Sequence, residues 1–118
     1  MPVTKFEDLE VWQEAMQLSK ELYHELKNCR DFSLRDQMQR SSVSIASNIA
    51  EGFDRRTNKE FIQFLYIAKG SCSELRTQLY LTKEIGTISA DAATMLLEKT
   101  RKISAMLYKL IKTRSEKF

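Results

Sequence analysis

Hydrophobic side chains recur every three or four positions along most of the chain, which is the spacing of one face of an α-helix. Four segments show this pattern, and short polar or glycine-containing stretches separate them. The pattern predicts helices at about 8–27, 34–52, 58–85 and 90–113. Four amphipathic helices joined by short loops favour an all-α fold. We predict an antiparallel up-down-up-down four-helix bundle that forms one domain over residues 1–118.

Residues typical of helix ends support several of these boundaries. Thr57 and Glu60 have the spacing of a capping box at the start of the third helix. Ser89 precedes the fourth helix, where it suits an N-cap. Gly52 and Gly86 stand where a left-handed residue would end the second and third helices. The chain has only three glycines and one proline, which agrees with long helices and few loops.

The first and third predicted helices carry more apolar surface than one bundle interior needs. In the first helix the apolar positions fill a sector of about 180°, whereas a little over 100° is usual. The third helix is apolar on several sides. We therefore expect copies of the chain to cover this surplus in a homo-oligomer. The residues expected at that contact are Val11, Leu18, Ile62 and Tyr66.

Charge is distributed unevenly along the chain, although the net charge is only +3. Residues 1–31 hold four basic and seven acidic side chains, and residues 32–98 hold eight of each. Residues 99–118 hold seven basic side chains and one acidic side chain. This asymmetry suits a head-to-tail contact in which the acidic surface of one copy meets the basic surface of the next. Contacts of that kind can close into a ring.

Basic side chains are the candidate nucleic-acid ligands, because lysine and arginine neutralise phosphates and release counterions. Those that lie within about 100° of one another on the fourth helix are Arg101, Lys102, Lys109 and Lys112. Arg114 follows them, and the loop before the third helix adds Arg55, Arg56 and Lys59 next to the aromatic Phe53. An aromatic residue beside cations suits single-stranded nucleic acid. The alternative is a solvated helix face, since cations are favoured near the C-terminus of a helix.

A polar seam is predicted along one edge of the second helix, beside its core positions. Its members are Gln37, Arg40, Ser44, Asn48 and Glu51. We expect Arg40 to pair with Glu51 or with Glu74 of the third helix. Half-buried polar groups need partners, so a satisfied network would fix the register between the two helices. A ligand-binding or catalytic role and a plain solvated face are the alternatives.

The sequence shows no recognisable catalytic machinery. His24 is the single histidine, and it lies on the polar face of the first helix with no partner at local spacing. The pair of Glu-x-x-His motifs that di-metal bundles use is absent, because Glu21 and His24 form the single copy in the sequence. The sequence also lacks a glycine-rich phosphate loop. Cys29 and Cys72 lack metal-ligand spacing, and Cys72 falls on an apolar helical face. We expect a non-enzymatic protein without a metal or cofactor.

The expected location follows from hydropathy. No apolar run is long enough to span a bilayer. The first residues are followed by acidic side chains and not by an apolar signal segment. We therefore expect a cytoplasmic protein with no membrane partner.

Three ordered blocks of the sequence resemble the 23S rRNA intervening-sequence protein family, also called the four-helix bundle protein family. They are FEDLEVWQ at 6–13, QRSSVSIASNIAEG at 39–52, and FIQFLYIAKGS at 61–71 followed by EL at 74–75. The resemblance covers nearly the whole chain. It implies a homopentameric ring of four-helix bundles, encoded in bacterial genomes and often within 23S rRNA genes. A related branch, the accessory proteins of diversity-generating retroelements, partners a reverse transcriptase and binds nucleic acid.

The leading hypothesis joins these observations. It is a ring-forming scaffold that binds RNA or DNA through basic surfaces and acts as an adaptor for a nucleic-acid enzyme such as a reverse transcriptase. Two alternatives stay open. One is a protein-interaction scaffold that does not bind nucleic acid, and the other is a small-molecule binder that uses the bundle core or the channel of the ring.

Overall fold

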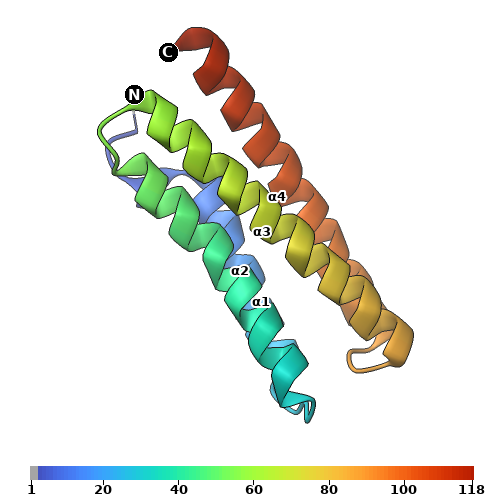
Figure 1. The fold of residues 1–118 in the computed structure, drawn as a ribbon. Coiled ribbons are helices and arrows are strands. Elements are labelled where there is room, and N and C mark those ends of the chain that lie inside the picture. The colour runs from blue at the N-terminus through green and yellow to red at the C-terminus, as the bar shows by residue number, and fades with distance from the viewer. Residues whose placement is uncertain (1–2) are drawn as a thin grey trace.

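The computed structural model describes residues 3–118, and within them it contains four α-helices and no strand. The elements are a 3-10 turn η1 at Phe6–Asp8, α1 at Glu10–Glu25, α2 at Phe32–Phe53, α3 at Asn58–Ile85 and α4 at Ala90–Lys117. The helices form an elongated bundle of 44 × 22 × 19 Å, in which each helix contacts two neighbours in the cyclic order α1, α2, α3, α4. Figure 1 shows the α1–α2 and α3–α4 loops at one end, and the α2–α3 loop at the other end with the start of α1 and the end of α4.

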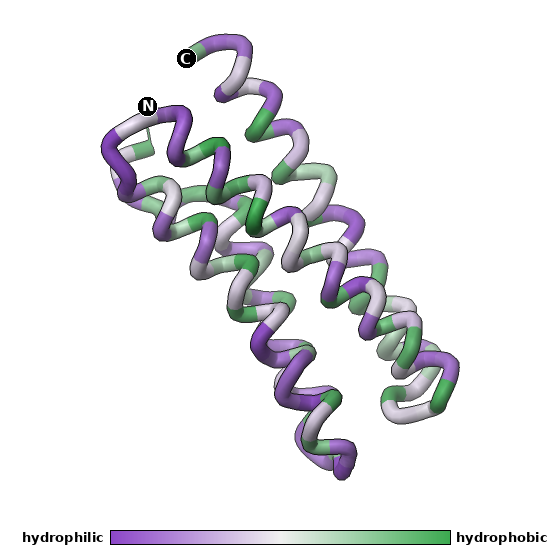
Figure 2. The backbone as a smooth tube through the Cα atoms, in the orientation of Figure 1, coloured by the Kyte–Doolittle hydropathy of each residue, from purple (hydrophilic) through white to green (hydrophobic). Residues whose placement is uncertain are grey.

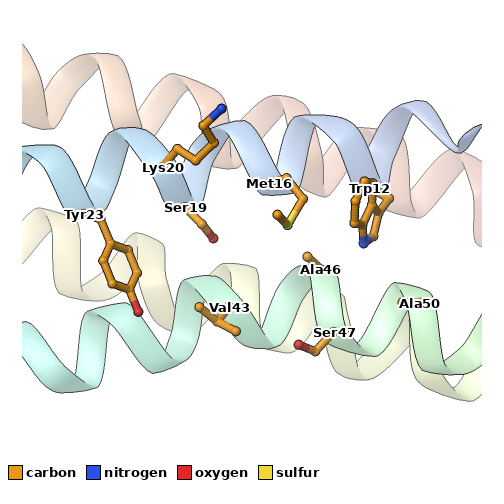
Figure 3. Close-up of a pocket in the computed structure, with 9 residues that line it drawn as sticks. All are labelled: Trp12, Met16, Ser19, Lys20, Tyr23, Val43, Ala46, Ser47 and Ala50. Atoms are coloured by element: carbon orange, nitrogen blue, oxygen red, sulfur yellow. The ribbon is translucent and has the colours of Figure 1, made fainter. Parts of the chain in front are cut away.

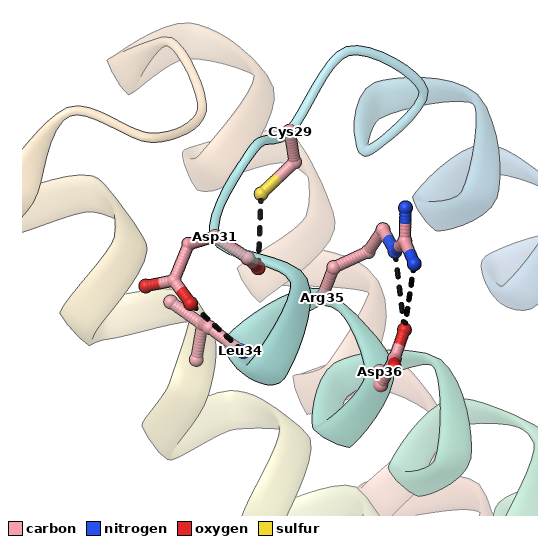
Figure 4. A network of polar contacts seen from close by, with 5 residues as sticks. All are labelled: Cys29, Asp31, Leu34, Arg35 and Asp36. Carbon is pink, nitrogen blue, oxygen red and sulfur yellow. Dashed lines mark hydrogen bonds and ion pairs between the residues drawn. The ribbon is translucent and has the colours of Figure 1, made fainter.

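Three helices differ at their ends from the ranges that the hydrophobic pattern predicts. α1 begins at Glu10, because the three residues from Phe6 form the 3-10 turn η1 instead. α2 begins at Phe32, because the Asp31 side chain caps it and accepts a hydrogen bond from the Leu34 N–H at 3.1 Å (Figure 4). α4 continues beyond residue 113 as far as Lys117. α3 coincides with the range 58–85.

The capping residues act largely as predicted. Thr57 Oγ1 accepts a hydrogen bond from the Glu60 N–H at 3.2 Å, and Ser89 Oγ accepts one from the Ala92 N–H at 3.2 Å. Gly86 ends α3 with φ of +77°, in the left-handed region that glycine tolerates. The prediction that Gly52 ends α2 in that conformation is wrong. α2 runs through Gly52 to Phe53 without a left-handed residue.

Apolar side chains from all four helices fill the interior, and Figure 2 shows hydrophobic and hydrophilic positions alternating along each helix. The side chains that are almost completely buried are Leu18, Leu22, Leu26, Met38, Ile45, Ile49, Leu65, Leu75, Leu79, Leu96, Ile103 and Leu107. Cys72 is buried among them, and its Sγ lies 3.2 Å from the carbonyl oxygen of Thr100. Burial raises the pKa of the Cys72 thiol to about 11, against the attraction of Arg76 and Lys69. Cys72 is therefore a small buried hydrophobe, as its place on an apolar face predicts.

The prediction that Val11 and Leu18 contact another copy is wrong. Their side chains are 4% and 0% exposed in a single chain. α1 packs against both α2 and α4, so its wide apolar sector is shared between two neighbours inside the bundle. Ile62 is half-buried, whereas Tyr66 is 59% exposed. The prediction that these two residues lie at a contact between copies stays open.

Candidate nucleic-acid interface

The fold divides the predicted basic residues into two groups. The first group lies in the middle of α4, beside the acidic side of α1. Lys102 Nζ donates to Glu14 Oε1 at 3.0 Å, and Lys99 Nζ lies 3.3 Å from Glu21 Oε2. Arg101 donates to the hydroxyl of Tyr80 at 2.6 Å. The acidic face of α1 therefore neutralises part of the basic stripe within the same chain.

The second group lies at the end of the bundle where the α2–α3 loop meets the last turns of α4 (Figure 1). Asn58 Nδ2 donates to the carbonyl oxygen of Arg114 at 3.0 Å and so joins the start of α3 to the end of α4. Segments 54–59 and 112–118 hold six cations and two carboxylates, Asp54 and Glu116. We call the six cations of these segments the cationic end. They are Arg55, Arg56, Lys59, Lys112, Arg114 and Lys117.

Two arginines of the cationic end are held by contacts within the chain. Arg55 Nη2 lies 2.7 Å from Glu51 Oε1, and the Arg55 guanidinium lies 4.8 Å from the centre of the Phe64 ring. The Arg114 guanidinium lies over two aromatic rings, at 4.8 Å from Phe61 and 3.9 Å from Phe118. Partial burial lowers the pKa of Arg114, but an arginine stays protonated at neutral pH and aromatic rings do not cancel its charge.

The other four cations of the cationic end differ from these two arginines, because they lack an ion-pair partner among the described residues. Arg56, Lys59, Lys112 and Lys117 are exposed and make no ion pair with any residue of the range 3–118. Lys109 is also exposed, but it lies nearer the middle of α4, where it lines a groove with Glu10 of α1.

The cationic end also contains an apolar cavity that the sequence pattern did not reveal. Its volume is about 260 Å³. The residues that line it are Val3, Leu9, Phe53, Phe61, Leu110, Thr113, Arg114 and Phe118. The Phe53 and Phe61 rings meet edge to face, with 5.6 Å between their centres. The spacing of Arg114 and Phe118, four residues apart on one helix, is the only local signal that could have predicted part of this arrangement.

The polar seam is partly satisfied, but by different pairs from those expected. Ser41 Oγ lies 2.6 Å from Glu74 Oε1, and the hydroxyls of Ser44 and Ser71 lie 2.9 Å apart. Asn48 Nδ2 donates to Ser44 Oγ at 2.9 Å. The first two contacts link α2 to α3, and the third lies within α2, in agreement with a structural role.

Arg40 does not make the predicted ion pair with either Glu51 or Glu74 in the described part of the chain. Glu51 is held by Arg55 four residues later, and Glu74 accepts from Ser41. The Arg40 side chain is exposed instead, at the edge of the seam. Gln37 is also exposed and donates weakly to Ser33 Oγ at 3.4 Å.

We expect Ser41→Ala to lower the free energy of unfolding by about 1 kcal/mol, because it removes a buried hydroxyl from a hydrogen bond with a carboxylate. Arg40→Ala, one residue away, should change it by less than about 0.5 kcal/mol, as most surface substitutions do. Urea denaturation followed by circular dichroism measures both. A larger loss for Arg40→Ala than for Ser41→Ala would contradict this assignment of partners.

A second surface feature is an apolar groove of about 560 Å³ between α1 and α2 (Figure 3). The residues that line it are Trp12, Met16, Ser19, Lys20, Tyr23, Val43, Ala46, Ser47 and Ala50. The mostly larger α1 side chains line one side of the groove, and the smaller α2 side chains line the other (Figure 3). Ser19 Oγ is buried there and has no hydrogen-bond partner within residues 3–118.

Residues 3–118 contain neither a metal-ligand cluster nor a membrane-spanning helix. No three histidine, cysteine, aspartate or glutamate side chains in this range come together in a way that could hold a metal ion. None of the helices in the same range is long and apolar enough to cross a membrane. His24 is exposed in the last turn of α1.

Comparisons with known proteins agree with the observed fold. A crystal structure of a protein of unknown function from the S23 ribosomal protein family of Bacteroides thetaiotaomicron superposes with a TM-score of 0.82 and 22% identity. The match covers 87% of this chain and 99% of that chain. No curated protein matches the chain. The family model described as 23S rRNA-intervening sequence protein matches residues 7–109. The chain therefore belongs to the 23S rRNA-intervening sequence protein family.

Proposed function

We propose that the chain is a non-enzymatic, cytoplasmic scaffold that binds the phosphate backbone of RNA or DNA through its cationic end. The observation that supports this best is that one end of the bundle holds Arg56, Lys59, Lys112 and Lys117. These cations come from segments more than 50 residues apart, and none of them makes an ion pair among the described residues. The family description, which refers to 23S rRNA, also favours an RNA-related role.

The binding that we propose is directed at the backbone and depends little on base sequence. Lysine and arginine side chains at the end of a bundle reach phosphates, whereas base-pair readout needs an element that enters a groove. Arg101 and Lys102 contribute less to this binding than the sequence predicted, because they already donate hydrogen bonds to Tyr80 and Glu14. A nucleic-acid enzyme, such as a reverse transcriptase, is the proposed partner that the scaffold would bring to the bound strand.

The test is fluorescence anisotropy with labelled RNA and labelled duplex DNA at ~50 and ~200 mM salt. Four phosphate contacts give a log–log slope of about −3 to −4, so affinity should fall by about a hundredfold over this range. Salt-independent binding, or no binding at ~50 mM salt, would contradict the proposal. The second result would favour the scaffold that binds only proteins.

We further propose that the bundle is antiparallel and up-down-up-down, which the alternating positions of the loops support (Figure 1). We also propose that copies of the chain assemble. The α1–α2 groove is apolar, and α3 exposes five large apolar side chains. They are Tyr66, Ile67, Tyr80, Leu81 and Ile85. Exposed apolar patches of this extent are typical of interaction sites. The exposed α3 face of one copy would fill the α1–α2 groove of the next copy. Such a heterologous contact can close a ring, and the family resemblance implies five copies.

Assembly is tested by size-exclusion chromatography with light scattering. The expected mass is a multiple of 13.8 kDa at micromolar concentration. Val43→Arg should dissociate the assembly, because Val43 lines the groove. Met95→Arg is the matched control, since Met95 lies on α4 away from the groove and both side chains are 44% exposed. A monomeric wild-type protein, or equal behaviour of the two variants, would remove the ring from the proposal.

A further inference from the structure

We infer that the cationic end takes an unpaired nucleobase of a single-stranded RNA or DNA into its apolar cavity. The inference rests on the proposed function, because it uses the same cations for the phosphates that flank the base. It goes further in two respects: it assigns a binding site to the cavity, and it states that single strands bind better than duplexes.

The cavity has the size and lining for a flat aromatic group. Its volume is about 260 Å³, and a cavity of about 150 Å³ is enough to hold benzene. Phe53 and Phe61 line it and contact each other edge to face. Leu110 and Thr113 of α4 also line it.

Arg114 shows that a planar group fits against these aromatic rings. Its guanidinium carbon lies 4.8 Å from the centre of the Phe61 ring and 3.9 Å from the centre of the Phe118 ring. Guanidinium groups and nucleobases are both planar and both stack on aromatic rings. Phe118 also lines the cavity and is 73% exposed, so it offers a further aromatic surface to a ligand there. A base beside Arg114 would meet an aromatic and cationic surface together.

Charge complementarity decides which occupant the cavity suits. Each aromatic residue that lines it stands within three positions of an unpaired cation: Phe53 near Arg56, Phe61 near Lys59, and Phe118 next to Lys117. An uncharged apolar ligand would gain nothing from these cations. A single-stranded nucleic acid carries a phosphate on both sides of every base, so a base in the cavity brings negative charge to the cations around it. A duplex keeps its bases stacked and cannot do so without unpairing them.

The first experiment fills the cavity and leaves every cation in place. Thr113→Phe puts a ring into the space, and Thr94→Phe is the control on the same helix, about 28 Å away at 1.5 Å per residue. We expect wild-type protein to bind a single-stranded RNA at least tenfold more tightly than a duplex of equal length. Thr113→Phe should remove that preference and leave duplex affinity unchanged, and Thr94→Phe should keep it. Single-stranded DNA in place of RNA tells whether the sugar matters.

The second experiment needs no variant, so it does not depend on how Thr113→Phe folds. A single strand with abasic sites keeps its phosphates but lacks bases, and its affinity should be about tenfold lower than that of the intact strand. Equal affinity for abasic and intact strands would overturn the inference. If single strands and duplexes bind equally and with steep salt dependence, the inference fails and the proposed function stands. If neither binds at ~50 mM salt, both fail.

Discussion

Replacing Gly52 by alanine is expected to lower the free energy of unfolding by about 3 kcal/mol, the upper part of the usual range for overpacking a core. A Cβ atom added at Gly52 would lie 2.4 Å from Phe64 Cβ and 3.1 Å from Phe61 Cδ1. Phe64 Cβ is attached directly to the backbone of α3, so no side-chain rotation relieves the clash. α2 and α3 would have to move apart. Urea denaturation of the purified variant, followed by circular dichroism, measures the loss.

Gly70→Ala is the matched control for this prediction. Gly70 lies in the interior of α3, and nothing stands within 4 Å of a Cβ atom added there. Alanine is favoured over glycine inside a helix, so this variant should be more stable than wild type by about 0.5–1 kcal/mol. Opposite signs for the two substitutions would establish close packing as the reason for glycine at position 52. A neutral effect of Gly52→Ala would show that α2 and α3 do not approach so closely.

Gly52 shows where local sequence rules stop. A glycine near the end of an apolar segment followed by polar residues predicts a left-handed helix end, and that rule holds for Gly86. At Gly52 the same residue type serves a contact with α3, which begins six residues later along the chain. Caps such as Thr57 and Ser89 were predictable because the groups that they bond are three residues away. A contact between helices leaves no such local signal.

The width of an apolar sector is a similar case. The sector of α1 predicted a second seam for another copy, but α1 has two neighbours in the bundle. Val11 and Leu18 are buried between these neighbours for this reason. Other apolar side chains do lie at the surface, among them Met16 and Tyr23 of α1 and Tyr66 of α3. Periodicity shows that a side chain is apolar at a given angle, but only the packed fold shows which neighbour covers that angle.

Charge was the least predictable part of the candidate interface. A helical wheel places four cations on one surface: Arg101, Lys102, Lys109 and Lys112. It cannot show which side chains of other helices contact them. The fold brings Glu14 to Lys102 and Tyr80 to Arg101. The fold also brings the α2–α3 loop to the end of α4. There Asn58 donates a hydrogen bond to the carbonyl oxygen of Arg114, which is 56 positions later in the sequence. The loop cations were predicted as candidates, and so were Lys112 and Arg114 of α4. Lys117 was not, and neither was the position of both segments at one end of the bundle.

Neutralising three cations of the cationic end together is expected to weaken nucleic-acid binding by about a hundredfold at ~0.1 M salt. The variant is Arg56→Gln with Lys59→Gln and Lys117→Gln. Each lost phosphate contact removes about one unit from the slope of log affinity against log salt, so the slope should become shallower by about three. These side chains are exposed and make no ion pair within residues 3–118, so the unfolding free energy should hardly change. Anisotropy at several salt concentrations measures the affinity and the slope.

The control changes the net charge by the same three units but lies in the middle of α4. It combines Lys99→Gln, Arg101→Gln and Lys102→Gln, whose side chains already contact Glu21, Tyr80 and Glu14. If nucleic acid responds only to the overall charge of the chain, both triple variants will lose affinity equally. If it binds where cations lack partners, the control should keep its salt slope and lose less than about threefold, by long-range attraction alone. Equal slopes in the two variants would indicate that nucleic acid binds along the whole basic stripe of α4 and is not centred on the cationic end.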